Sequence, residues 1–189
     1  MLRFRIQGTP NPRARKYVVN YDLKTEGKVT YKSRSECAHL PLGQALFTIP
    51  GVQQIHFFEN VATVTQDGNR EWADFDQQVQ EAIIAHIDKH DPKFPDSIEK
   101  EKEKEKEKPK NWSPVMQKID EILDEMIRPS LQMDGGDIEV VDLEENILTL
   151  RYMGACGGCP TSMSGTLEAI RGILKDEIHQ DLEIVAIDF

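Results

Sequence analysis

The sequence predicts an α+β protein with two small mixed α/β domains that are joined by a charged flexible linker. Three observations support this prediction. The acidic residues concentrate in one part of the chain, a low-complexity charged run separates two segments, and each segment mixes β-rich runs with helical periodicity. The expected boundaries are residues 1–97 for the first domain, 98–112 for the linker and 113–189 for the second domain. A chain of 189 residues has room for two domains of this kind, each with a modest core.

The net charge of -10 is distributed unevenly along the chain. Residues 1–98 hold 12 basic and 12 acidic side chains, residues 99–110 hold 6 and 5, and residues 111–189 hold 5 and 16. The acidic excess therefore belongs to the last segment, whose net charge is -11. Nucleic-acid binders need a basic face that displaces the counterions of the phosphates. We therefore expect no nucleic-acid partner.

The run Glu99–Lys110 alternates glutamate with lysine and contains no apolar residue. On a helix this alternation would place like charges at i,i+4 and opposite charges at i,i+3, so favourable and unfavourable pairs would largely cancel. Such a run cannot bury enough apolar surface to offset the entropy that ordering costs. We therefore expect a solvated linker that lets the two domains reorient.

The chain has neither the roughly 18 to 20 consecutive apolar residues that cross a bilayer nor the apolar core of a signal peptide at its start. These features predict a cytoplasmic protein without a membrane partner. The three cysteines are Cys37, Cys156 and Cys159, and an odd count in such a chain argues against a disulfide scaffold. In a reducing compartment, a close pair of cysteines more often binds a metal or takes part in redox chemistry.

The first domain is expected to contain five strands and two helices. The β-rich runs are Leu2–Gln7, Lys16–Tyr21, Gly27–Tyr31, Gln54–Phe58 and Val61–Thr65. A short helix is expected after Pro41 and a longer one after Asp74. His86 and His90 stand four residues apart near the end of the longer helix, but no third metal ligand is evident, so we interpret them as structural. Cys37 is interpreted as a buried, inert thiol.

The second domain is expected to begin with an amphipathic helix, continue as a β-hairpin and end with a helix and a strand. Ser113 caps the first helix and Pro114 takes its first position. This helix is expected to end or kink at Arg128-Pro129. The elements that follow are a glycine turn at Asp134–Asp137, strands Ile138–Leu143 and Ile147–Tyr152, a helix from Pro160 and a strand Leu182–Ile187. The inner face of the last helix is expected to consist of Met163, Leu167, Ile170, Ile173, Leu174 and Ile178.

A Cys-x-x-Cys motif, formed by Cys156 and Cys159, lies between the hairpin and the helix that Pro160 opens. The free N–H groups and the positive dipole end at a helix N-terminus favour anions, and therefore thiolates. A tetrahedral zinc site or an iron-sulfur cluster needs four protein ligands, and this pair supplies two. His179 would lie about 30 Å away, at the far end of a helix of about 20 residues. The simplest source of two further ligands is therefore a second copy of the chain.

The acidity of the second domain bears on this dimer. Two such domains, at -11 each, repel one another unless a metal group links them. We therefore expect a chain that is largely monomeric without its cluster and a homodimer when the cluster is bound.

Several spaced motifs identify a family that fits this site. In the second domain, the residues on which the resemblance rests are Arg128-Pro129, Met133–Ile138 (MDGGDI), Gly154–Pro160 (GACGGCP) and Thr166-Leu167. Together they make residues 114–189 resemble the C-terminal domain of the NifU-like (Nfu) iron-sulfur cluster scaffold and carrier proteins. The first domain is similar to the Nfu N-terminal domain through Thr9–Pro12, Pro41–Val52 and Phe57-Phe58.

The resemblance implies that the protein is not an enzyme but a scaffold or carrier. By position, Cys156 and Cys159 of each of two subunits would be the metal ligands of a bridging iron-sulfur cluster, usually [4Fe-4S]. The cluster would come from a donor and pass to apo iron-sulfur recipient proteins. Cys37 has no part in this site.

Two other functions use the same two thiols. A thiol-disulfide oxidoreductase also places a Cys-x-x-Cys motif between a strand and a helix, but the order of elements here differs from the thioredoxin-like βαβ context. A structural zinc-binding dimer would need the same four thiolates without any transfer. An inert domain with an incidental motif is the remaining alternative. The constellation around the motif favours the carrier.

Overall fold

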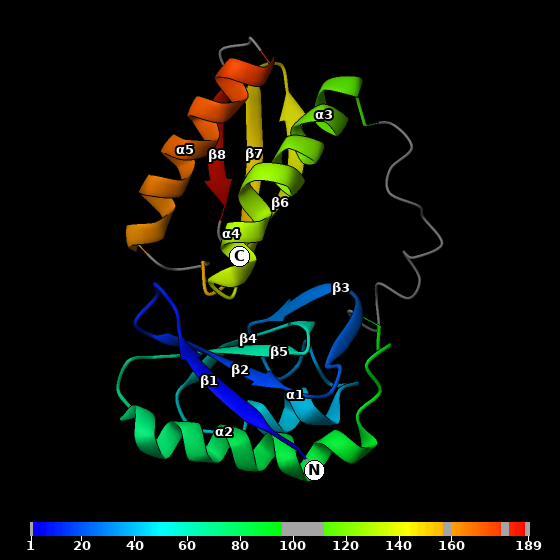
Figure 1. The fold of residues 1–189 in the computed structure, drawn as a ribbon, viewed down its shortest axis with the longest axis vertical. Coiled ribbons are helices and arrows are strands. Elements are labelled where there is room, and N and C mark those ends of the chain that lie inside the picture. The colour runs from blue at the N-terminus through cyan, green and yellow to red at the C-terminus, as the bar shows by residue number, and fades with distance from the viewer. Residues whose placement is uncertain (1, 96–111, 157–159, 179–181, 188–189) are drawn as a thin grey trace. The chain divides into compact units, whose positions relative to one another are not determined.

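The computed structural model describes residues 2–95, 112–156, 160–178 and 182–187, which form two compact units (Figure 1). The first unit is built on a five-stranded sheet and the second on a three-stranded sheet. The predicted α+β class with two mixed domains is therefore confirmed. The boundaries given for the linker stay a prediction, because residues 96–111 lie outside the described residues.

The first unit combines an antiparallel sheet with two α-helices. Its strands are β1 (Phe4–Gly8), β2 (Ala14–Val19), β3 (Lys24–Tyr31), β4 (Val52–Glu59) and β5 (Val61–Gln66), in the order β1-β2-β5-β4-β3. Its helices are α1 (Pro41–Leu46), α2 (Trp72–His86) and the short 3-10 turn η1 (Ile87–Lys89).

All five predicted strands form. β3 starts earlier than predicted, at Lys24, because a bulge between Lys24 and Lys28 interrupts its pairing with β4 without ending the strand. α2 also starts earlier than predicted, at Trp72.

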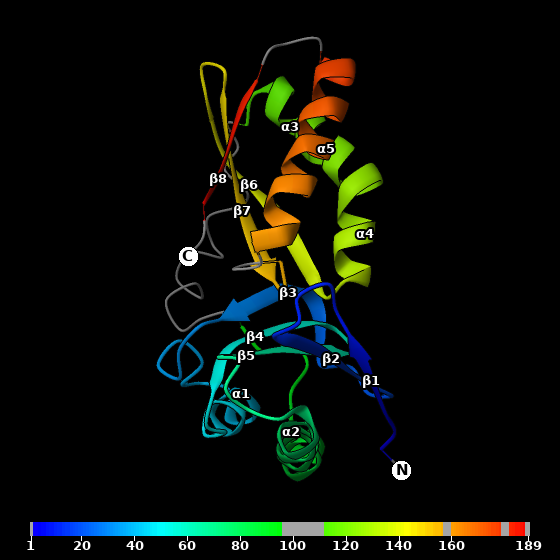
Figure 2. The same cartoon turned by 90° about the vertical axis from the view of Figure 1, so that its left-hand side faces the viewer.

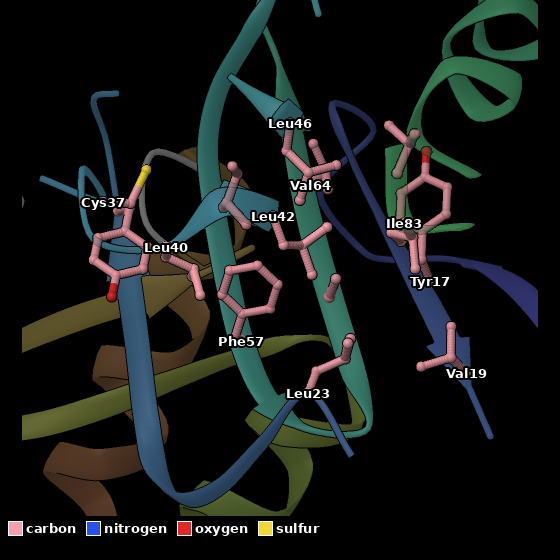
Figure 3. Close-up of a cluster of buried hydrophobic side chains, with 14 of the residues drawn as sticks. Tyr17, Val19, Leu23, Cys37, Leu40, Leu42, Leu46, Phe57, Val64 and Ile83 are labelled. Atoms are coloured by element: carbon pink, nitrogen blue, oxygen red, sulfur yellow. The ribbon is translucent and has the colours of Figure 1, made fainter. Parts of the chain in front are cut away.

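Helices α1 and α2 cover one face of this sheet (Figure 2). The core of this unit contains large buried side chains such as Tyr17, Phe57, Phe75 and Ile83. Cys37 lies among the buried side chains of this core, as Figure 3 shows. This unit therefore has its own hydrophobic core. Fully burying one side chain of this kind contributes about 1.5 to 3 kcal/mol to its stability.

The second unit places three helical segments on one face of its sheet (Figure 2). In chain order it contains α3 (Pro114–Ile122), the π-helical turn η2 (Leu123–Ile127), α4 (Arg128–Met133), β6 (Gly136–Glu144), β7 (Ile147–Gly154), α5 (Pro160–Ile178) and β8 (Glu183–Ile187). β6 pairs antiparallel with β7, and β8 pairs parallel with β7. The predicted cap is confirmed, since Ser113 Oγ accepts a hydrogen bond of 3.2 Å from the Met116 N–H. No helix among the described residues is long and apolar enough to span a membrane.

The helical segment that begins at Pro114 does not end at Arg128-Pro129. It continues as α4 to Met133, with the π-helical turn immediately before Arg128. Pro129 lies in the first turn of α4, where a missing backbone N–H costs little, and the wider π turn shifts the hydrogen-bond pattern at the join. The sequence therefore marks the irregularity correctly but not the end of the helical segment.

The inner face predicted for α5 is confirmed in its described part. Ile170 and Leu174 are buried, while Leu167, Ile173 and Ile178 pack against the same core. The side chain of Met163 lies outside the described residues. This face packs α5 onto the sheet and so fixes the helix that follows the cysteine motif.

Candidate functional site

The first cysteine of the predicted motif lies in a turn between β7 and α5. β7 ends at Gly154, Ala155 and Cys156 form the turn, and α5 begins at Pro160. The predicted order of strand, cysteine loop and helix is therefore confirmed for these elements. Cys159 lies outside the described residues, so its pairing with Cys156 stays a prediction.

The start of β6 lies directly against this turn. β6 and β7 pair Gly136 with Gly154, and the Ala155 N–H donates a hydrogen bond of 3.0 Å to the Gly135 carbonyl. A Cβ atom at position 136 would stand 2.2 Å from the Cys156 sulfur and 2.9 Å from the Cys156 Cβ and backbone nitrogen. No side chain fits at such distances, so Gly136 is required for close approach rather than for an unusual φ.

The two glycines of the predicted turn therefore have different roles. Gly135 has φ +80, a conformation that residues with a side chain rarely adopt, and it forms the turn itself. Gly136 already belongs to β6, so the turn is shorter than Asp134–Asp137. The sequence predicted the first role and missed the second.

The thiol of Cys156 faces the hydrophobic core of the second unit. The residue is 4% exposed and belongs to the same buried cluster as Ile138, Tyr152 and Ile170. Soft thiolate sulfur suits iron and zinc. Among the described residues, no three His, Cys, Asp or Glu side chains gather into a group that could hold a metal ion. The described part of one chain thus supplies one suitable donor at this turn.

A buried arginine connects the helical segments to the start of β6. Arg128 is 7% exposed, and its Nε donates a hydrogen bond of 2.9 Å to the Ile138 carbonyl. Its Nη1 donates to Asp124 Oδ1 at 2.6 Å, and its Nη2 forms an ion pair with Asp120. Burial opposes the charge of the guanidinium, but these hydrogen bonds outweigh it and raise the pKa of Arg128.

Asp137 completes this network from the strand. The residue is 0% exposed; its Oδ1 accepts a hydrogen bond of 2.7 Å from the Ile138 N–H, and its Oδ2 accepts one of 3.0 Å from Gln132 Nε2. Its Oδ1 also lies 3.8 Å from Arg128 Nε. Arg128 and Asp137 therefore anchor the segment that contains Gly136, the residue in contact with Cys156.

The two histidines of the first unit are bonded to main-chain carbonyls. His86 Nδ1 donates to the Ala82 carbonyl at 2.8 Å, and His90 Nε2 donates to the Leu23 carbonyl at 2.7 Å. Each ring thus has a structural partner of its own, which supports the structural interpretation of both residues.

His90 should make the stability of the first unit depend on pH. Burial lowers its pKa below the ordinary 6.5, against the opposing effect of the hydrogen bond to Leu23. The unfolded chain then binds a proton more readily than the folded one, so stability is lost as pH falls below about 6.5 and levels off below the folded pKa. The slope should stay under about 1.4 kcal/mol per pH unit, the limit for one proton.

Urea unfolding of the first unit between pH 5 and pH 8 measures this effect. The His90→Gln variant keeps an N–H that can donate to Leu23 but cannot take up the proton, so its unfolding midpoint should change less with pH than that of the wild type. Equal pH dependence in the two proteins would show that His90 does not cause it.

Cys37 has the properties of an inert thiol. It is fully buried, and burial raises the pKa of its thiol to about 11, although a hydrogen bond from Gln44 opposes the shift. The thiol is therefore protonated at neutral pH, and the thiolate that metals and electrophiles require is scarce.

The fold and this site define a protein with two α+β units, one of which carries a cysteine turn at the start of a helix. Two family models match these units. The model of the scaffold protein Nfu/NifU N terminal matches residues 4–90, and that of the NifU-like domain matches residues 119–185. The chain therefore belongs to the Nfu/NifU-like iron-sulfur cluster scaffold proteins, with an Nfu N-terminal domain and a NifU-like C-terminal domain.

Curated relatives agree with both matches. The chain is 29% identical to NifU-like protein C1709.19c of Schizosaccharomyces pombe over 97% of its own length and 72% of that protein. It is 30% identical to NifU-like protein 4, mitochondrial, of Arabidopsis thaliana, covering 92% of this chain and 62% of that protein. It is also 28% identical to NFU1 iron-sulfur cluster scaffold homolog, mitochondrial, of Drosophila grimshawi, covering 89% of this chain and 56% of that protein. The chain thus spans somewhat more than half to about three quarters of these relatives.

Proposed function

We propose that the protein holds an iron-sulfur cluster between two subunits through Cys156 and Cys159 of each, and that it transfers this cluster to apo-proteins. The observation that carries the proposal is the position of Cys156, in the turn between β7 and α5 of a NifU-like domain. Cys156 precedes α5 in the chain, and a thiol brought to the N-terminus of that helix would be favoured as thiolate, the form that binds iron.

The number of ligands favours a shared cluster. A cluster such as [4Fe-4S] takes four thiolates, and the motif of one chain offers two. Cys37 is buried in the core of the other unit with a thiol pKa raised to about 11, so it is a poor third ligand. A second copy of the chain related by a two-fold axis would complete the set.

The charge of the second domain supports a dimer that depends on its cargo. Its net charge of -11 opposes association. The domain has five basic side chains, and one of them, Arg128, is already paired with Asp120 inside the domain. The cluster then links the chains, and they separate when it leaves.

Weak retention suits transfer. Because each chain contributes two thiolates, a recipient can replace one pair at a time with its own cysteines. Bonds from iron to the carrier's thiolates are then exchanged for bonds to the recipient's thiolates, and no covalent bond of either protein changes. Apo iron-sulfur proteins with cysteine ligands are the recipients that this exchange requires, and a cluster donor must act before it. We propose a non-enzymatic carrier on these grounds.

Anaerobic purification followed by an absorption spectrum and analysis of iron, sulfide and zinc tests the proposal. Iron with an equimolar amount of sulfide, together with transfer to an apo-acceptor, supports the carrier. Zinc alone would support the structural zinc dimer instead. A metal-free protein with a reversible disulfide between Cys156 and Cys159 would support the thiol-disulfide oxidoreductase.

The cytoplasmic location predicted from the sequence remains part of the proposal. The names of the Arabidopsis and Drosophila relatives place those proteins in mitochondria. Fractionation of cells that express the protein at native level distinguishes the two compartments, and enrichment in mitochondria would contradict the prediction.

A further inference from the structure

We infer that Gly136 is a positioning residue for Cys156, and that it holds the thiol in a sheltered position while no cluster is bound. The significance of Cys156 rests on the proposed function, but the shelter itself is a property of the chain without cargo. Its basis is the contact between the start of β6 and the cysteine turn.

The contact leaves no space for a side chain at position 136. A Cβ there would stand 2.2 Å from Cys156 Sγ, and the next two contacts at 2.9 Å are to the Cβ and the backbone nitrogen of the same residue. The sulfur alone could rotate away from a new methyl group, but the backbone nitrogen cannot. An alanine at position 136 must therefore move the turn that carries Cys156.

The position of the thiol follows from this contact. With glycine at 136, the Cys156 side chain fills the space that a Cβ would take, and the residue is 4% exposed. A buried thiol is poorly accessible to oxidants and alkylating reagents, which attack the exposed thiolate. The arrangement thus protects one ligand of the proposed site before the cluster arrives.

Two features hold the turn and also define where it can move. The Ala155 N–H is bonded to the Gly135 carbonyl, which fixes the turn against β6. Gly154 and Gly135, with φ +64 and φ +80, stand on either side of this bond. A cluster shared with a second chain must meet the sulfur at the surface, so the turn has to leave Gly136 when it binds. The two glycines are positions at which the backbone can absorb that change.

Site-resolved alkylation of the metal-free full chain tests the shelter. Iodoacetamide is added under reducing conditions, and mass spectrometry of peptides follows Cys156. In the native wild type, Cys156 should react at least about tenfold more slowly than in the urea-unfolded chain, because reaction requires local opening. In Gly136→Ala, native Cys156 should lose most of this protection. Equal rates in native and unfolded wild-type chains would overturn the inference.

Gly172→Ala is the matched control. Gly172 lies on α5, and apart from its chain neighbours and the backbone of its own helix no described atom lies within 4 Å of the position a Cβ would take, so alanine there should leave the rate at Cys156 unchanged. Cys37 serves as an internal reference in each sample, because it lies in the core of the other unit. A rate in Gly136→Ala that equals the rate in the Gly172→Ala control would also overturn the inference.

A second measurement applies if Gly136→Ala folds poorly. In a Cys156→Gly background, both the sulfur and the Cβ that collide with the new methyl group are absent. Gly136→Ala should then lower the urea midpoint of the second unit less than it does in the wild type. The clash with the backbone nitrogen of residue 156 remains in this background, so an equal loss in both would show that the Cys156 side chain is not what Gly136 accommodates. All these measurements use the metal-free chain, so their outcome is independent of whether the protein binds a cluster.

Discussion

Replacing Arg128 with methionine is expected to destabilise the second unit by about 3 kcal/mol, the lower end of the cost of removing one partner from a buried ion pair. Methionine keeps much of the apolar volume but removes the ion pair with Asp120 and the cation that lies 3.8 Å from the Asp137 carboxylate, which is 0% exposed. The Ile138 carbonyl also loses its donor. Asp124 is 64% exposed and can be hydrated, so the loss of its ion pair with Arg128 adds little to the destabilisation.

Urea unfolding measures this change. Trp112 packs against the core of the second unit and Trp72 against that of the first, so a Trp72→Phe background lets fluorescence report the second unit. Arg171→Met is the matched control, since Arg171 forms an exposed ion pair with Glu168 on α5. That substitution should cost less than about 1 kcal/mol. Equal losses from the two substitutions would contradict the structural role given to Arg128.

Replacing Cys156 with alanine is expected to abolish cluster binding. Each chain would then offer one thiolate of the proposed pair, and a dimer two, whereas the cluster takes four. Iron and sulfide in the reconstituted protein should fall to background. Cys159→Ala should have the same effect, since both thiols are proposed as ligands.

Cys37→Ala is the control for these variants. It makes the same chemical change at a buried cysteine in the other unit, and it should keep the iron and sulfide content of the wild type. Circular dichroism should show a folded chain in every case. Wild-type iron content in Cys156→Ala would refute the ligand assignment.

The order of strands and helices could be predicted because β-rich runs mark the strands and helical spacing of apolar residues marks the long helices. The runs that form β2 and β5 place Tyr17 and Val64 in the core, and the i,i+4 spacing of Phe75, Val79 and Ile83 does the same for α2. Patterns of this kind locate an element but not its ends. The helical segment after Pro114 continued past Pro129 because the proline stands in the first turn of α4, directly after a π turn, and a π turn has no local signature.

The site shows the same limit more clearly. The sequence identified Cys156, because a Cys-x-x-Cys motif is visible in the chain, but it could not separate the roles of Gly135 and Gly136. Two adjacent glycines look alike until the strand pairing shows that one turns the chain and the other leaves space for a sulfur. Asp137 likewise resembled a turn residue, and only the fold shows that it is buried beside Arg128.

Sedimentation of the protein before and after removal of its cluster tests the central proposal most directly. The cluster-loaded protein should sediment at twice the mass of a single chain, with one cluster per two chains. After chelation of the iron, the same sample should sediment largely at the mass of one chain, because the two acidic domains then repel each other. A cluster-loaded monomer, or a tight dimer that persists without the cluster, would contradict the proposal that the cluster joins the two chains.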